Sequence, residues 1–293
     1  MDWRAIGLGV LFAAMWSSAF TSARIIVAEA PPFLALGVRF LLSGLIALGI
    51  GFALGQRLPR APAQWRAIAI FGLCQNALYL GLNFLAMRSI EASLAAVIAS
   101  ALPLIVAALS WSVFGERLRP LALFGLAAGF AGVIVIMAAR IGAGAPPLAI
   151  GLCLAGALAL AVATLTVRGA SASGDLWIAV GLQMLVGAAA LFPVSLASET
   201  WVVNWTPAFF AAFAYTVLFP GIAATMIWFV LVRRIGATRA ATFHFLNPFL
   251  GVATAALILG ETVTARDLIG VAIIMAGILA VQLSRRPAPE PSR

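Results

Sequence analysis

The chain contains no lysine, a single histidine and few charges of either sign. Only 9% of its 293 residues are charged, whereas about 25% is usual for a soluble globular protein. Hydrophobic residues make up 64% of the chain, and the mean hydropathy is +1.12. So few charges cannot cover a surface that faces water, which excludes a soluble protein and predicts an integral membrane protein.

Cysteines and catalytic motifs are also scarce. Cys74 and Cys153 both fall in apolar segments, without the spacing of metal ligands or of a disulfide framework, so we interpret them as small apolar core residues. The chain has no G-x-S-x-G nucleophile elbow, no H-E-x-x-H zinc motif, no Walker A sequence and no paired carboxylates within an apolar segment. These absences predict a protein that is not an enzyme and that uses neither a metal nor a cofactor.

Arginine supplies all 18 basic residues, and the net charge is +9. In a soluble protein this charge would favour a nucleic-acid partner. Here the arginines are spread singly over short loops, which is typical of the cytoplasmic loops of membrane proteins. We therefore expect the lipid bilayer and a small-molecule substrate as partners, and no nucleic acid.

Ten apolar segments follow one another along the chain. Each is about 19–24 residues long, enough to cross about 30 Å of hydrocarbon as a helix. The segments must be helical, because lipid offers no partner to unpaired backbone groups. Their expected ranges are 5–27, 33–55, 65–86, 92–114, 121–139, 147–168, 176–197, 207–230, 237–259 and 267–284.

The distribution of arginine predicts the orientation in the membrane. The termini and loops of one side carry thirteen arginines and the loops of the other side carry four, with Arg39 inside the second span. We therefore expect a multi-pass protein of the bacterial inner membrane with both termini in the cytoplasm, and a disordered, proline-rich cytoplasmic tail at 285–293. The larger set is Arg4, Arg57, Arg60, Arg66, Arg117, Arg119, Arg168, Arg233, Arg234, Arg239, Arg285, Arg286 and Arg293. The smaller set is Arg24, Arg88, Arg140 and Arg266.

The stretch 80–137 is repeated at 225–282, displaced by 145 positions. Residues 1–140 and 147–284 are therefore expected to form two repeats of five spans each. An odd number of spans forces the second repeat to lie upside down relative to the first, as in many secondary transporters, which bind substrate between the two repeats. The predicted fold is thus an all-α membrane protein of ten transmembrane helices, arranged as two inverted five-helix repeats around a central cavity. The matching pairs include Arg88 and Arg233, Pro103 and Pro248, Gly115-Glu116 and Gly260-Glu261, and Gly132 and Gly277.

Polar residues inside the spans indicate which helix faces turn away from lipid. Asn76, Tyr79 and Asn83 share one face of the third span, at i, i+3 and i+7. We interpret such residues as the lining of a cavity whose amides and hydroxyls bind a small polar solute. Hydrogen bonding between helices, worth only about 0.6 kcal/mol per contact, stays open as the alternative. The predicted substrate-binding residues are Trp16, Ser17, Thr21, Asn76, Tyr79, Asn83, Ser100, Trp228, His244 and Asn247.

Three prolines and two glutamates have predicted structural roles. Pro103, Pro220 and Pro248 lie near the middle of spans, where each removes a backbone hydrogen bond and kinks its helix. Kinks at matched positions favour gating around a central site, and a fixed bend stays open as the alternative. Glu116 and Glu261 each follow a glycine at the end of a repeat's fourth span, and we expect them to anchor the positive N-terminus of the fifth.

The placement of the carboxylates bears on coupling. None of the nine acidic residues lies in the middle of a span. Proton coupling through a buried acid is therefore not expected, because such a mechanism usually needs a titratable carboxylate within the membrane. Movement down a gradient and coupling through His244 both stay open.

Glycines predict close packing of the fifth and tenth spans. Gly125, Gly129 and Gly132 recur along the fifth span, and Gly270 and Gly277 lie at the matching positions of the tenth. Small residues at this spacing let helix backbones approach closely. We favour packing within one chain over a dimer interface, and hence a monomer.

The order of these features resembles the drug/metabolite transporter superfamily, in particular its branch of EamA-type ten-helix carriers. The resemblance implies two inverted repeats around a central cavity, and export of amino acids or related metabolites, with the YddG-like amino-acid exporters as neighbours. The chain lacks the helix-1 glutamate of the small multidrug-resistance relatives, so their proton-exchange mechanism is not implied. The residues that carry the resemblance are Trp16-Ser17-Ser18, Arg39-Phe40, Pro103, Phe114-Gly115-Glu116-Arg117-Leu118, Gly125, Gly132, Asn247-Pro248, Gly260-Glu261, Gly270 and Ala276-Gly277.

We therefore expect a secondary transporter that exports amino acids or similar small polar metabolites by alternating access. The alternative within the transporter class is a carrier of another solute, such as a drug or a nucleotide sugar. The third interpretation is a membrane protein without transport activity.

Overall fold

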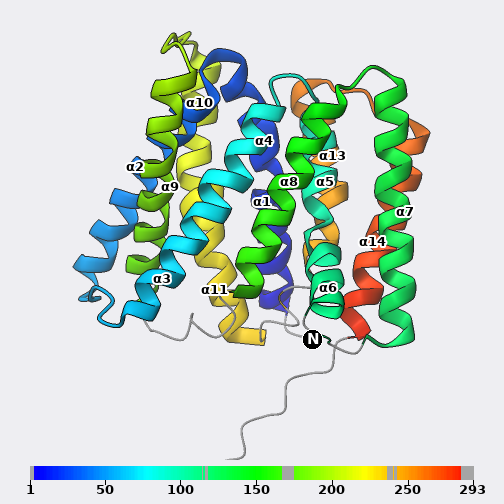
Figure 1. Cartoon of the computed structure of the whole chain (residues 1–293), viewed down its shortest axis with the longest axis horizontal. Helices are drawn as coiled ribbons and strands as arrows, with labels where there is room; N and C mark the ends of the chain where they lie inside the picture. The colour runs from blue at the N-terminus through cyan, green and yellow to red at the C-terminus, as the bar shows by residue number, and fades with distance from the viewer. Residues whose placement is uncertain are drawn as a thin grey trace, which may run out of the picture.

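The computed structural model describes residues 3–113, 115, 118–166, 175–235, 240 and 243–284. Over this part of the chain the backbone forms helices and no β-strand, and the helices stand side by side in one bundle (Figure 1). The first repeat comprises α1 (Trp3–Glu29), α2 (Pro32–Ala53), α3 (Pro62–Phe71), η1 (Gly72–Tyr79), α4 (Leu80–Ala86), α5 (Ala92–Ser100), α6 (Leu102–Ser112) and α7 (Pro120–Gly142). The second comprises α8 (Pro147–Thr166), α9 (Leu176–Ser198), α10 (Pro207–Thr216), η3 (Val217–Ala223), α11 (Ala224–Ile235), η4 (Phe243–Leu246), α13 (Asn247–Leu259) and α14 (Ala265–Ser284).

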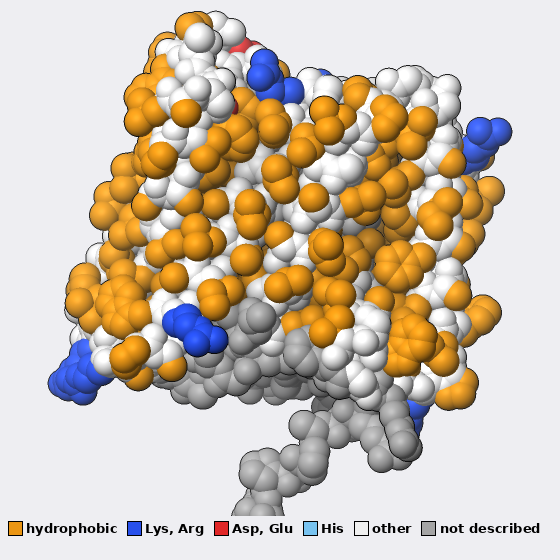
Figure 2. All heavy atoms as spheres, viewed as in Figure 1, with side chains coloured by type: hydrophobic (Ala, Val, Ile, Leu, Met, Phe, Trp, Pro, Cys, Tyr) orange, Lys and Arg blue, Asp and Glu red, His pale blue; other side chains and the backbone are white. Residues whose placement is uncertain are grey.

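The predicted all-α membrane fold is confirmed. Among the described residues, nine segments are long and apolar enough to cross a membrane, and the shorter Phe243–Leu259 makes a tenth apolar segment. The predicted start of that segment at 237 and the predicted tail at 285–293 lie outside the described residues. Figure 2 shows hydrophobic side chains over the middle of one face, with basic side chains near its edges.

Two of the three predicted proline kinks take a different form. The fourth span breaks at Ala101, after α5, and Pro103 then lies in the first turn of α6. Its repeat counterpart Pro248 lies in the first turn of α13, directly after the tight 3₁₀ turn of η4. Proline is tolerated in a first turn because the N–H that it lacks would be unpaired there, so the chain breaks before each proline. Pro220 does lie within a span, inside η3.

Two π-helical segments interrupt the third and eighth spans. η1 begins at Gly72 and η3 begins at Val217, which is the same position in the two repeats. A π turn inserts an extra residue and rotates the side chains that follow, and such turns are frequent at functional sites. A uniform helical period of 3.6 residues does not predict them, so they are absent from the expectations above.

Each repeat caps the second span of the other. The carboxylate of Glu199, which follows α9, accepts hydrogen bonds from Phe33 N–H and the next N–H of α2, both at 2.9 Å. Reciprocally, Gln56 Oε1, which follows α2, accepts from Trp177 N–H and the next N–H of α9, at 2.9 and 3.3 Å. The first N–H groups of a helix have no partner within it, so each repeat supplies an acceptor that the other needs.

Glu261 also caps a helix of the opposite repeat. Its carboxylate accepts from the Ala92 and Ser93 N–H groups at the start of α5, at 2.7 and 2.9 Å. Glu261 therefore anchors α5 and not the following α14, whose start is capped locally by Thr264. Thr264 Oγ1 accepts from Asp267 N–H at 3.3 Å, and Asp267 Oδ2 accepts from Thr264 N–H at 2.8 Å. The expectation of a contact with the next span was wrong because inverted repeats bring the end of one helix beside the start of a distant one. Glu116, the counterpart of Glu261, lies outside the described residues.

The predicted glycine contact lies within the chain, between α7 and α14, which stand together at one edge of the bundle (Figure 1). A Cβ atom at Gly125 would lie 2.7 Å from the Gly277 carbonyl oxygen, and a Cβ at Gly277 would lie 2.6 Å from the Gly125 carbonyl oxygen. A Cβ at Gly132 would lie 2.9 Å from the carbonyl oxygen of Gly270. The two backbones therefore touch directly, and a side chain at these positions would force them apart.

This packing predicts opposite effects for two Gly→Ala substitutions. Gly277→Ala should lower the melting temperature in detergent, because overpacking against a backbone typically costs about 1–3 kcal/mol. Gly49→Ala in α2 is the matched control, since a Cβ there would meet nothing within 4 Å; it should leave the melting temperature unchanged or raise it. Equal effects of the two substitutions in a thermal unfolding assay would contradict the close contact of α7 with α14.

The reciprocal caps predict a loss of stability when Glu199 is neutralised. Glu199→Gln retains one acceptor oxygen but removes the charge-assisted bonds to the start of α2, which should cost about 0.5–2 kcal/mol. Glu29→Gln is the control, because the side chain of Glu29 makes no hydrogen bond within the described part of the chain. Melting temperatures of the purified proteins compare the two, and a larger decrease for Glu29→Gln would exclude the cap.

Candidate functional site

A central cavity of about 860 Å³ lies between the two repeats. Its lining comes from spans one, two, three, four and six to nine, and none of it comes from α7 or α14. The paired fifth and tenth spans thus stand outside the cavity. Both π-helical segments contribute to the lining, with Tyr79 from η1 and Gly221 from η3.

The two ends of the cavity differ. At one end the lining includes exposed residues of the connection between α2 and α3, among them Leu58 and Arg60. At the other end the lining consists of buried side chains such as Phe84 and Met87, each 1% exposed. The cavity therefore opens toward the connection at 57–60 and is closed toward the end of α4.

The predicted substrate-binding residues divide into three groups. The first group lines the central cavity and comprises Trp16, Asn76, Tyr79, Asn83, Trp228 and His244. The second comprises Ser17, Ser100 and Asn247, which with Trp16 line a separate pocket of only about 10 Å³. A space of this size holds about one water molecule. The third group is Thr21 alone, which lines neither space and donates to Thr254 Oγ1 at 3.2 Å.

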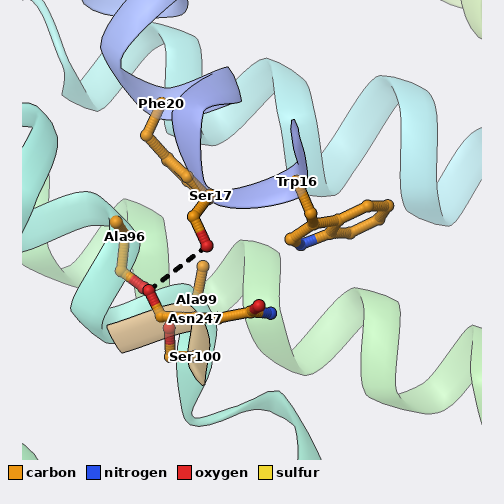
Figure 3. A pocket seen from close by; sticks show the side chains of 7 residues that line it. All are labelled: Trp16, Ser17, Phe20, Ala96, Ala99, Ser100 and Asn247. Atoms are coloured by element: carbon orange, nitrogen blue, oxygen red, sulfur yellow. Dashed lines mark hydrogen bonds between the residues drawn. The ribbon is translucent and has the colours of Figure 1, made fainter. Parts of the chain in front are cut away.

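The small pocket lies where α1, α5 and α13 meet (Figure 3). Ser17 Oγ donates to the backbone oxygen of Asn247 at 3.3 Å, and Ser100 Oγ donates to Ala96 O within its own helix at 2.6 Å. A Cβ atom at Gly251 would lie 2.5 Å from Ala96 Cβ, so α5 and α13 are in close contact. These hydroxyls serve helix packing at a tight seam between the two repeats.

On the predicted polar face of the third span, some side-chain groups hold helices together and one is left without a hydrogen bond. Asn76 Nδ2 donates to the backbone oxygen of Gln183 at 2.9 Å, which joins η1 to α9. Asn83 Nδ2 donates to Tyr79 O at 2.7 Å, within its own span. Asn83 Oδ1 is buried and accepts no hydrogen bond from the residues that the structure describes. An acceptor without a donor beside a cavity is a group that a bound solute can satisfy.

The imidazole of His244 lies in an aromatic cluster at the cavity wall. Its ring centroid is 5.3 Å from those of Phe12 and Trp228 and 6.2 Å from that of Trp16. Asn247 Nδ2 lies 2.9 Å from His244 Nδ1. The pair thus connects the central cavity with the small pocket.

Charged residues of the lining were missing from the predicted site. Arg39 of α2 lines the cavity inside the membrane, and Arg57, Arg60 and Asp175 line it near the mouth. The arginine count for topology set Arg39 apart as lying inside the second span but assigned it no role. A charge inside an otherwise apolar span is itself the signal for a functional residue.

The comparisons with known proteins agree with this arrangement. The model of the EamA-like transporter family matches residues 3–138 and again residues 147–283. The "Uncharacterized inner membrane transporter YedA" of Escherichia coli is 28% identical over 282 residues, covering 94% of this chain and 90% of that protein. The "Uncharacterized transporter YvbV" of Bacillus subtilis is 26% identical over 269 residues, with 91% and 88% covered. The "Probable amino-acid metabolite efflux pump" of Salmonella typhimurium is 28% identical over 287 residues, with 92% of each protein covered. A solved crystal structure covers 97% of this chain and 98% of its own at 22% identity with a TM-score of 0.69, which shows the fold alone.

The central cavity and the small pocket are predicted to differ in their access to water-soluble reagents. In a background with both native cysteines replaced, Ala67→Cys in the cavity lining should react readily with a charged methanethiosulfonate reagent. Ala99→Cys, in the small pocket and 8% exposed before substitution, should react far more slowly. Ala63→Cys, at an exposed position of α3, provides the reference rate. Equal reaction rates at positions 67 and 99 would contradict the claim that the packing of α1, α5 and α13 closes the small pocket to solvent.

Proposed function

Because this chain belongs to the EamA-like transporter family, and is therefore a membrane transporter rather than an enzyme, we propose that it exports amino acids or related small polar metabolites across the inner membrane. The observation that carries the proposal is the cavity of about 860 Å³ between inverted repeats. Its volume lies in the range of roughly 300–1,000 Å³ that is usual for small-molecule sites. Secondary transporters bind their solutes at this place in the fold.

The open end of the cavity bears on the side from which this conformation takes up its solute. The mouth lies at the connection 57–60, on the side that carries the larger set of arginines, which the positive-inside rule assigns to the cytoplasm. A cavity open on this side supports loading of the solute from the cytoplasm. Release outside requires the seam of α1, α5 and α13 to open while the mouth closes. The contacts Ser17–Asn247 and Thr21–Thr254, at 3.3 and 3.2 Å, are single weak hydrogen bonds that can be exchanged.

The chemistry of the lining supports a solute with an amino group. Asn83 Oδ1 lacks a donor, and an ammonium group supplies one. The rings of Trp16, Trp228 and Phe12 form an aromatic wall that can hold a cation or an apolar side chain. The relative from Salmonella typhimurium, whose name gives amino-acid metabolites as its cargo, supports the same substrate class.

A flux assay tests this function. The purified protein in liposomes should exchange at least one radiolabelled amino acid in a saturable manner. Asn76→Ala and His244→Ala should each reduce that flux by about tenfold or more, since a polar contact to a charged solute contributes about 1.5–3 kcal/mol. Asn204→Ala is the matched control, because Asn204 is exposed outside the cavity, and it should leave the flux unchanged.

Folding of each variant is checked by its melting temperature and gel-filtration profile. Unchanged flux in both folded cavity variants would remove the assignment of the cavity. Absence of flux for every amino acid in the wild-type protein would remove the proposed substrate class.

A further inference from the structure

Arg39 is a buried cation that pairs with no acidic side chain in the part of the chain that the structure describes. It lies in α2, about 10 Å along the helix from its start at 1.5 Å per residue, and it is only 5% exposed. Its Nε is buried without an acceptor, and Arg39 takes part in none of the hydrogen bonds or ion pairs formed within the described part of the chain. Its guanidinium also lies against the ring of its neighbour Phe40, whose centroid is 5.1 Å from Cζ.

Four of the six acidic residues that the structure describes are engaged elsewhere, and neither of the other two, Glu29 and Asp175, forms an ion pair with Arg39. Glu91 and Asp267 pair with Arg140 at the far end of the bundle, and Glu199 and Glu261 cap helices. An unpaired cation in this setting is unfavourable by several kcal/mol even after relaxation. A purely structural role does not account for such an arrangement, because a structural arginine would be paired.

The guanidinium lies at the junction of the two repeats. A Cβ atom at Gly221 in η3 would lie 3.9 Å from Arg39 Nη2 and 3.3 Å from Ser43 Oγ. The absence of a side chain at Gly221 thus keeps the space beside the guanidinium open. Arg39 and Gly221 both line the central cavity, so a solute there reaches a cation held between a helix of one repeat and the π turn of the other.

The charges nearer the mouth agree with an anionic group on the solute. Arg57 and Arg60 line the approach, against Asp175 as the acid of the lining. A cleft with an excess of one charge concentrates solutes of the opposite charge. The excess of arginine over acid in the lining therefore disfavours amines without an acidic group.

We propose that Arg39 binds the carboxylate of the transported solute, so that the cavity selects solutes with a carboxylate over the corresponding amides and amines. Arginine suits this role because its planar guanidinium donates two parallel hydrogen bonds to a carboxylate. The inference rests on the proposed function and deepens it, since it names the group of the solute that is recognised and the residue that recognises it.

The test compares matched probes on the wild-type protein. Each of the twenty standard L-amino acids and its carboxamide is added to the purified protein, and the shift of the melting temperature and the inhibition of flux are measured. A stabilising amino acid should have a half-effective concentration about 10- to 100-fold lower than its amide, the ratio expected for a charge-assisted hydrogen bond. Equal effects of acid and amide would overturn the role of Arg39 and leave amino-acid transport intact.

Variants assign the effect to the residue. Arg39→Gln should remove the preference for the acid over the amide, Arg39→Lys should keep part of it, and Arg66→Gln, at an exposed position outside the cavity, should keep all of it. The preference is a ratio within one protein, so it does not depend on the amount of folded variant. An undiminished preference in Arg39→Gln would overturn the proposal.

A third probe set separates this inference from the proposed function. If no amino acid is transported or stabilises the protein, benzoate, succinate and inorganic phosphate are tested in the same way. Stabilisation by one of these anions that Arg39→Gln abolishes would support anion binding by Arg39 while the amino-acid assignment fails. Absence of any effect that depends on Arg39 would overturn both.

Discussion

The need to satisfy backbone N–H groups at helix ends, where water is scarce, organises this molecule. Each helix presents unpaired donors at its start, and in a membrane such groups are costly. Inversion of the two repeats offers a solution, because it brings the end of a helix in one repeat beside the start of a helix in the other. Glu199 and Gln56 use this geometry reciprocally, and Glu261 uses it at α5. The repeats are therefore held together by polar contacts at the rims and by glycine contacts between α7 and α14, which leaves the centre free for a cavity.

The same constraint explains why the centre can change shape. Caps hold the starts of the second, fourth and seventh spans, and glycine contacts join the fifth span to the tenth, whereas the lining comes partly from spans that are broken or π-helical. Breaks before Pro103 and Pro248 and the wider turns of η1 and η3 leave carbonyl groups outside a regular ladder, which makes those spans easier to rearrange. The fifth and tenth spans form a closely packed edge, and the broken and π-helical spans supply the adaptable part of the cavity wall. Arg39, which forms no hydrogen bond or ion pair with the described residues, lies in α2 beside the π turn of the other repeat.

Hydropathy and the internal repeat suffice to predict the fold, because both depend on composition and spacing alone. The face of Asn76, Tyr79 and Asn83 was also predictable, since amides in lipid must turn inward. The sequence could not show that Ser17 and Ser100 lie between packed helices and not in the lining of the central cavity. A serine hydroxyl can donate to a nearby backbone carbonyl, so it is tolerated in either place. The caps between repeats and the π turns could not be predicted, because they depend on which helices become neighbours. Hydropathy and residue spacing along the chain do not contain that information.

The inversion of the repeats is the central claim, and the sidedness of two matching loops tests it most directly. Leu58 lies in the connection after the second span and Val202 lies in the connection after the seventh, and both are exposed. Single cysteines at these positions, in a background without Cys74 and Cys153, can be labelled in sealed vesicles with a maleimide that does not cross membranes. Inverted repeats predict that Leu58→Cys and Val202→Cys are labelled from opposite sides of the membrane. Labelling of both from the same side would contradict the inversion, and with it the reciprocal caps and the cavity between them.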